Sequence, residues 1–218
     1  MSADARWTAP PSEFLVPFDG SFRVSRAPTA PRTDVAKSEL KSQRKERTRA
    51  IRDLQKKLYA DDRYSVLFVF QAMDAGGKDS TIRSVFTGVN PAGFQVSSFK
   101  APSSEELDHD FLWRIARRLP ERGRIGVFNR SHYEEVLVVR VHPEFLEGQR
   151  LPSYDLDTIW AERFESIRTF EKHLADNGTI IVKFFLNVSL AQQKHRFLRR
   201  IDKPSKNWKF SARDVKER

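Results

Sequence analysis

Cysteine is absent from this chain of 218 residues, which excludes disulfide bonds, thiolate zinc sites and cysteine nucleophiles. Long apolar runs are absent too, so no segment is long enough to cross a bilayer as a helix. The first residues, MSADARWTAPPSEF, lack the apolar stretch of a signal peptide. We therefore expect a cytoplasmic location and no membrane partner.

Acidic residues are scarce in two segments, and the excess of Lys and Arg that gives the net charge of +10 is confined to these segments. Residues 37–57 hold nine Lys or Arg against three Asp or Glu, and residues 194–218 hold ten against three. Two such segments suit an extended polyanion, such as nucleic acid, an anionic membrane or a phosphate polymer. The alternative is that both are solvated helix faces.

Hydrophobic residues make up 39% of the chain and include seventeen Phe, which predicts a globular core. Residues 1–35 are rich in proline and lack periodicity, so we expect an irregular arm. Residues 36–59 have a helical pattern, with an apolar stripe formed by Leu40, Ile51, Leu54 and Leu58.

Short apolar segments then alternate with helical patterns along the chain. Strands are predicted at 66–71, 94–99, 124–129 and 179–186. The helices between them are marked by apolar positions at Ile82, Val85, Phe86 and Val89, at Leu107, Phe111, Ile115 and Leu119, and at Trp160, Phe164, Ile167 and Leu174. Apolar strands separated by amphipathic helices predict an α/β fold, a parallel sheet with helices on both faces.

Two local patterns refine this prediction. Ser103 and Glu106 have the spacing of a capping box, which opens the helix that runs to Leu119. The segment SHYEEVLVVRVH (131–142) fits either a strand or a helix, and we favour a helix because Tyr133, Val136, Leu137 and Arg140 keep helical spacing.

The stretch FVFQAMDAGGKDST (68–81) leads from the first predicted strand into a helix and nearly matches the phosphate-binding P-loop. Ala72 stands where that pattern has its first glycine, and Asp79 stands where it has a hydroxyl. The backbone N–H groups of Gly76, Gly77 and Lys78 can still converge on a phosphate at the helix N-terminus. The alternative is a plain tight turn.

Two carboxylates flank the lysine of this loop. Asp74 inside a phosphate site would repel the ligand unless a divalent cation lay between them, so it is a candidate metal ligand or catalytic group. Asp79 is either a catalytic group or a first-turn aspartate that stabilises the helix. Ser80 and Thr81 keep hydroxyls nearby.

The third predicted strand ends in FNRSHYEE. Asn129 stands where a Walker B carboxylate would hold Mg²⁺, and Arg130 can clamp phosphate with two parallel hydrogen bonds. His132 fits a structural or capping role better than a proton shuttle. Near the C-terminus, a basic helical face suits a lid over transferring phosphate, although a solvated helix is the alternative; its residues are Arg196, Arg199, Arg200 and Lys203.

These motifs together resemble the polyphosphate kinase 2 family from about residue 37 to the end of the chain. QAMDAGGKDSTI resembles its Walker A motif, FNRSHYEEVLVVRVHPE its Walker B motif and RFLRRIDKPSKNWKFS its lid. The resemblance implies a three-layer α/β/α P-loop kinase fold related to thymidylate kinase, with a basic helical lid. Asn129 followed by RSHYE looks like the class III-like branch, which phosphorylates both AMP and ADP.

The activity that the resemblance implies is transfer of phosphate between inorganic polyphosphate and AMP or ADP, forming ADP or ATP, with Mg²⁺ or Mn²⁺. It implies a homo-oligomer, either a dimer or a tetramer, and no nucleic-acid partner. The residue roles follow the motifs: catalysis by Asp74, Lys78 and Arg130; metal binding by Asp74 and Asn129; nucleotide binding by Asn129, Arg130 and Arg140; and phosphate binding by Ala75, Gly76, Gly77, Lys78, Asp79, Ser80, Arg196, Arg199, Arg200 and Lys203. Arg140 lies within the Walker B stretch, but no motif fixes its role.

The resemblance also has a departure. Family members continue past the lid with a further helix, a fifth strand and a closing helix, so we expect the lid segment 193–218 to be incomplete and this chain to be poorly active by itself. The expected divisions are an arm at 1–35, a kinase core at 36–192 and the lid at 193–218. Rival functions are an NTP-dependent kinase and a nucleic-acid-binding protein, the latter disfavoured because the sequence has no RNP-like, helix-turn-helix or zinc motif.

Overall fold

The computed structural model describes residues 8–30, 35–202 and 204–207. The chain divides into two compact units. One comprises Met1–Val35, Met73–Gly76 and Asn187–Arg218, and the other comprises Ala36–Ala72 and Gly77–Leu186. Lys203, one of the predicted lid residues, lies outside the described residues. The expected division into arm, core and lid stays a prediction.

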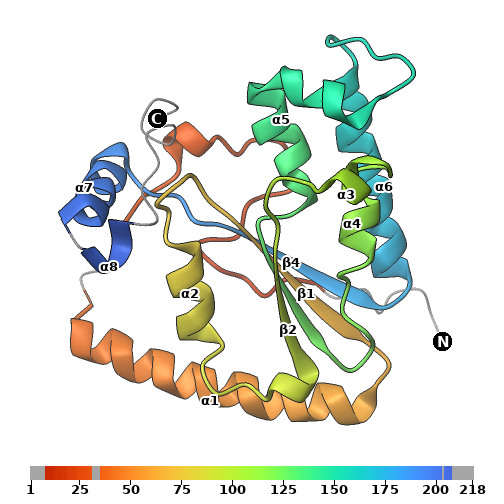
Figure 1. Ribbon diagram of the computed structural model, residues 1–218. Coiled ribbons are helices and arrows are strands. Elements are labelled where there is room, and N and C mark those ends of the chain that lie inside the picture. The colour runs from red at the N-terminus through yellow and green to blue at the C-terminus, as the bar shows by residue number, and fades with distance from the viewer. Residues whose placement is uncertain (1–7, 31–34, 203, 208–218) are drawn as a thin grey trace. The chain divides into compact units, whose positions relative to one another are not determined.

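The larger unit is built on a parallel sheet of four strands in the order β2-β3-β1-β4 (Figure 1). The strands are β1 (Ser65–Gln71), β2 (Phe94–Ser98), β3 (Ile125–Asn129) and β4 (Thr179–Phe185). Each lies where the apolar segments predict it. Phe70 is in register with Asn129 on one side and with Phe184 on the other, so the carboxyl ends of the three strands β1, β3 and β4 meet at one edge.

Helices connect the strands of this unit. They are α1 (Lys37–Asp61), α2 (Lys78–Val85), α3 (Ser104–Leu107), α4 (Trp113–Ala116), α5 (Val138–Val141) and α6 (Ile159–Asp176). Short 3₁₀ segments are η2 (Pro91–Gly93), η3 (His132–Val136) and η4 (Pro143–Gln149). Segment 131–142 is therefore helical, as predicted. In the smaller unit the described elements are η1 (Val24–Arg26), α7 (Leu190–Asp202) and α8 (Pro204–Asn207).

Alternate residues of the strands form a hydrophobic core on each face of the sheet. On one face Phe70 and Val127 pack with Ile82 of α2 and with Phe86, the residue that follows α2, and α1 adds Ile51 to this core. The other face has its own core, formed by Leu67, Val69, Phe99, Ile115 and Phe128, with Phe170 of α6 packed against it. Helices thus cover both faces, which confirms the three-layer prediction.

Burial separates the central strands from the edge strands. The central strands β1 and β3 are almost wholly buried, whereas β2 and β4 are only partly so. Val96 of β2 and Phe184 and Phe185 of β4 are exposed, so the prediction of strands buried throughout is wrong for the two edges. An edge strand has a neighbour on one side only, and its side chains are covered correspondingly less.

The predicted apolar stripe of the first helix is also partly wrong. Leu40 and Leu54 are exposed, while Gln55 is 3% exposed. The Gln55 amide donates to the Asn90 carbonyl at 3.1 Å and accepts from the Asn90 N–H at 3.2 Å, so its polar atoms are satisfied. A polar side chain can be buried at this contact because its amide N–H and its amide oxygen are both hydrogen-bonded.

The capping box at Ser103 and Glu106 is present as predicted, but the helix that it opens does not run to Leu119. It ends at Leu107, and α4 begins only at Trp113. Between them the Asp110 carboxylate accepts the Leu112 N–H at 2.8 Å. Aspartate side chains compete in this way with the helical pattern of backbone bonds, which explains the break.

Candidate phosphate-binding site

The turn between β1 and α2 places a lysine at the start of a helix. Gly77 has a φ of 95°, a left-handed conformation that glycine adopts readily, and α2 begins at the next residue. The Thr81 N–H donates to the Gly77 carbonyl and closes the first turn. Lys78 is only 9% exposed, and its Nζ donates to the Ala72 carbonyl at 3.2 Å. The ammonium group is thereby held beside the loop that leads into the helix.

Two other loop residues have defined contacts in this turn. The Ser80 hydroxyl donates to the Gly77 carbonyl at 2.8 Å, so its proton is used within the helix terminus. Asp79 is a first-turn residue of α2, where a negative charge opposes the positive end of the helix dipole. The predicted helix-stabilising position of Asp79 is therefore observed.

The preceding loop segment, Met73–Gly76, belongs to the smaller unit with helix α7. Gln193 Nε2 donates to the Asp74 carbonyl at 3.0 Å, and Arg196 Nη1 donates to the Ala75 carbonyl at 2.9 Å. Both hydrogen bonds are accepted by backbone carbonyl oxygens of the loop, and neither of them involves the Asp74 carboxylate. Ala75 has a φ of 59°, so α7 holds a left-handed turn in place at a non-glycine residue.

At the end of β3, Asn129 contacts the start of α2. Asn129 Nδ2 donates to Asp79 Oδ1 at 3.0 Å. Arg130 follows with a φ of 63°, and its N–H donates to the Phe70 carbonyl at 3.1 Å. A left-handed conformation at a residue other than glycine costs roughly 1–3 kcal/mol and persists only when its surroundings hold it. The Arg130 guanidinium lies 3.5 Å from the Glu134 carboxylate and is half-buried.

Asn129 and Asp79 are two side chains with oxygen atoms that can bind a divalent cation. Their contact uses the Asn129 amide N–H, so the amide must turn before its oxygen can serve as a ligand. Mg²⁺ is commonly held by one or two protein carboxylates together with water and substrate phosphates. Among the described residues there is no group of three His, Cys, Asp or Glu that could hold a metal without such help.

The other predicted site residues are distributed along α7 and α5. Arg196 is bonded to the loop, Arg199 is exposed, and the Arg200 guanidinium lies 5.2 Å from the Phe197 ring centroid. Arg140 is exposed on α5. Within the larger unit the structure therefore brings together Lys78, Asp79, Asn129 and Arg130, and within the smaller unit it brings together Asp74, Ala75, Gly76 and Arg196.

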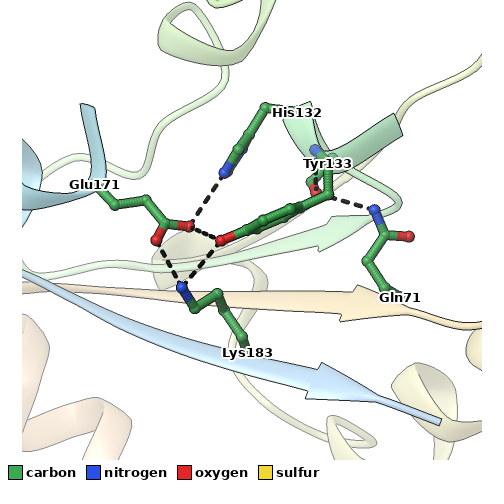
Figure 2. Close-up of polar contacts among 6 residues, drawn as sticks. Gln71, His132, Tyr133, Glu171 and Lys183 are labelled. Atoms are coloured by element: carbon green, nitrogen blue, oxygen red, sulfur yellow. Dashed lines mark hydrogen bonds and ion pairs between the residues drawn. The ribbon is translucent and has the colours of Figure 1, made fainter. Parts of the chain in front are cut away.

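Sequence reasoning missed a cluster of polar side chains that joins η3, α6 and β4 (Figure 2). Glu171 of α6 accepts from the Tyr133 hydroxyl at 2.9 Å and from His132 Nε2 at 3.2 Å. Lys183 of β4 donates to the other oxygen of Glu171 at 2.6 Å and to the Tyr133 hydroxyl at 3.0 Å. The one signal in the sequence is Lys183 itself, a charge inside the apolar run TIIVKFFL.

Electrostatics in this cluster keep Glu171 ionised. Burial raises the pKa of Glu171, but the His132 hydrogen bond and the Lys183 charge outweigh it and lower the pKa to about 2. Burial and the Glu171 charge raise the pKa of Tyr133 to about 12. Burial lowers the pKa of Lys183, yet the charge of Glu171 more than compensates and leaves it raised.

Comparison with known proteins explains the motifs at this site. The model of the family Polyphosphate kinase 2 (PPK2) matches residues 34–218. This chain belongs to the polyphosphate kinase 2 family. The resemblance read from its three motifs is confirmed.

Curated relatives and solved structures agree with this family. An "ADP-polyphosphate phosphotransferase" of Rhodopseudomonas palustris is 61% identical over 76% of this chain and 58% of its own length. An "AMP/ADP-polyphosphate phosphotransferase" of Meiothermus ruber is 49% identical over 78% of this chain and 60% of its own. The crystal structure of polyphosphate kinase 2 from Arthrobacter aurescens TC1 matches with a TM-score of 0.82 at 36% identity and covers 91% of this chain and 69% of that one.

These comparisons confirm the predicted P-loop-type α/β fold. The chain also spans only about three-fifths of the length of these two curated relatives, 58% and 60%. In the part of the chain that the structure describes, no helix has both the length and the apolar character needed to cross a membrane.

Proposed function

We propose that the protein transfers phosphate between inorganic polyphosphate and AMP or ADP, as a phosphotransferase of the EC 2.7.4 type. The observation that carries this proposal is the turn from β1 into α2, where Lys78 is buried at the helix N-terminus and the next residue, Asp79, contacts Asn129 at the end of β3. The names of the relatives in R. palustris and M. ruber supply the donor and the acceptor.

Binding of the donor rests on the loop and on Lys78. Backbone N–H groups at the start of α2 and the positive end of the helix dipole favour a phosphate there. The Lys78 ammonium neutralises the phosphoryl oxygens, on which negative charge must be held while the terminal P–O bond of the polymer breaks. The nucleotide phosphate oxygen forms the new bond, and the polymer leaves one phosphate shorter.

Arg130 and Asn129 act at the acceptor side of this scheme. Arg130 is held at a fixed backbone geometry, and its guanidinium can bind a phosphate with two hydrogen bonds once it turns from Glu134. In the larger unit, Asn129 and Asp79 are the residues that would hold a divalent cation, Mg²⁺ or Mn²⁺, and Asp74 stays a predicted metal ligand. When bound, the cation supplies positive charge that draws the phosphates of donor and acceptor together.

The polymer itself is assigned to the basic residues of α7. Arg199 and Arg200 lie one turn beyond Arg196, which is already bonded to the Ala75 carbonyl. Arg199 is exposed and Arg200 is half-buried, and arginines at such spacing along a helix suit a chain of phosphates. Arg140 as a nucleotide contact, the homo-oligomer and the cytoplasmic location stay predictions.

Donor identity is the decisive test. The purified protein is incubated with AMP or ADP and polyphosphate in the absence of any NTP, and ADP and ATP are quantified. A matched reaction contains ATP and AMP without polyphosphate. Product that depends on polyphosphate supports the proposal, whereas product formed only with an NTP donor would assign the same loop to a conventional nucleotide kinase.

A further inference from the structure

The 3₁₀ segment η3 begins two residues after Arg130 and is tied to helix α6 by two carboxylates, the partly buried Glu171 and the buried Glu135. Glu171 of α6 contacts His132 and Tyr133 near the start of η3. Toward its end, Glu135 is 8% exposed and accepts from Gln149 at 2.9 Å, and Arg163 of α6 lies 3.4 Å from it. The segment of five residues is thus anchored to one long helix through both networks.

A short 3₁₀ segment needs such anchors. Its hydrogen-bond geometry is poorer than that of an α-helix, and few backbone bonds hold it. A buried carboxylate, conversely, is tolerated only when it is paired and hydrogen-bonded. Glu171 is paired three times, since one oxygen accepts from His132 and Tyr133 and the other from Lys183.

The anchored segment leads back to Arg130 through Ser131. Ser131 is 3% exposed, and its hydroxyl accepts from Gln71 Nε2 at 3.1 Å and from the Tyr133 N–H at 3.2 Å. Gln71 ends β1, at the entrance to the phosphate loop. The left-handed backbone of Arg130 therefore lies between the strand pairing of β3 and a segment that Glu171 fixes.

We propose that Glu171 is a positioning residue for phosphoryl transfer: by holding His132 and Tyr133 it fixes η3 and so maintains the strained backbone that presents Arg130 to the acceptor phosphate. This inference rests on the proposed function for its consequence in catalysis. Its structural half, the effect of Glu171 on the backbone at Arg130, stands independently of the substrate.

Hydrogen exchange tests the structural half. Glu171→Gln keeps the shape of the side chain and removes the charge that pairs with Lys183 and His132. Glu165→Gln, an exposed position on the same helix, is the matched control. We expect amide protection in residues 130–137 to fall about tenfold or more in Glu171→Gln, while protection of β1 residues 66–70 and of the control protein stays at the wild-type level.

Two outcomes of that measurement would overturn the inference. Unchanged protection at 130–137 would show that Glu171 does not hold η3. An equal loss across 66–70 and 130–137 would show that the residue contributes only to global stability. If Glu171→Gln does not fold, Tyr133→Phe serves instead, because it removes one hydroxyl contact and leaves Glu171 paired with Lys183.

Kinetics test the catalytic half through a double-mutant cycle with Arg130. In the wild-type background we expect Glu171→Gln to lower kcat with polyphosphate about tenfold while the KM for polyphosphate changes less than twofold. In the Arg130→Ala background the same change should alter kcat less than twofold, since the group that it positions is already gone. A full tenfold loss in both backgrounds would refute action through Arg130. A wild-type protein that phosphorylates AMP or ADP only with an NTP donor would refute the proposed function, whereas the exchange result would still decide the structural half.

Discussion

Asn129 at the end of β3 donates a hydrogen bond of 3.0 Å to Asp79 in the first turn of α2, and this contact joins the sheet to the helix that begins at the phosphate loop. The pair has a single carboxylate, so it carries one negative charge rather than two. An aspartate at position 129 would place two carboxylates in contact, an arrangement that is unfavourable without a bound cation.

The first prediction follows from that contact. In Asn129→Asp we expect the free energy of unfolding, measured by urea titration in EDTA, to fall by about 1 kcal/mol because a hydrogen bond is lost and two like charges meet. Added Mg²⁺ should restore the loss, whereas it should change the wild-type value little. The swapped double variant Asn129→Asp/Asp79→Asn, with one carboxylate again, is the control and should behave like wild type. If Mg²⁺ does not restore the stability of Asn129→Asp, the result argues against a cation site here.

The second prediction concerns Lys78. Removing a charged contact to a transferring group typically lowers the rate by about 10²–10³-fold, so Lys78→Ala should lose that much of its polyphosphate-dependent kcat. Circular dichroism and the unfolding midpoint should show that the fold persists. Lys172→Ala, an exposed lysine on α6, is the control for a lost surface charge and should keep its rate. Activity of Lys78→Ala within a few-fold of wild type would contradict the assignment of this turn as a phosphate-binding loop.

The sheet, the phosphate loop and its sequence motifs were predictable because they depend on local periodicity and on residues adjacent in the chain. Gln55 was not, because its partner Asn90 lies 35 positions away. The Glu171 cluster combines residues from η3, α6 and β4, with Tyr133 and Lys183 separated by 50 positions. The charge pattern along one helix does not reveal these contacts, because the residues of the cluster come together only when α6 packs against the sheet.

The break between α3 and α4 shows the opposite limitation. The apolar spacing from Leu107 to Leu119 is compatible with one helix, and only Ile115 among those positions is fully buried. The local competitor, the Asp110 carboxylate, was visible in the sequence. The hydrogen bond that it accepts from the Leu112 N–H interrupts the helix, although the apolar spacing continues through this point.

The third prediction addresses the polymer. Replacing Arg199 and Arg200 with Ala should raise the KM for polyphosphate several-fold and flatten its dependence on salt concentration, because fewer phosphate contacts then release counterions. The measurement is the KM at a series of KCl concentrations. A double variant of two exposed basic residues on α6, Arg168→Ala/Lys172→Ala, controls for net charge. The same KM and salt slope in both double variants would mark α7 as a solvated surface helix.

The last prediction concerns acid stability and Glu171. The folded-state pKa of Glu171 is lowered to about 2 from an ordinary value of 4.5, so its ionised form stabilises the fold fully above pH 4.5 and loses that contribution as the pH falls toward 2. Because one pKa unit corresponds to ~1.4 kcal/mol, the full contribution is roughly 3 kcal/mol. Glu171→Gln cannot titrate at this position, so the difference in unfolding free energy between wild type and variant should shrink as the pH is lowered from 5 to 2.5. Urea titrations at half-unit pH intervals measure this difference. Glu165→Gln is the control, because Glu165 is an exposed residue of the same helix. The unfolding free energy of this control should follow the wild-type pH dependence far more closely than that of Glu171→Gln does. A constant difference between wild type and Glu171→Gln over that range would mean that the Lys183 and His132 contacts do not stabilise the ionised carboxylate in the folded protein.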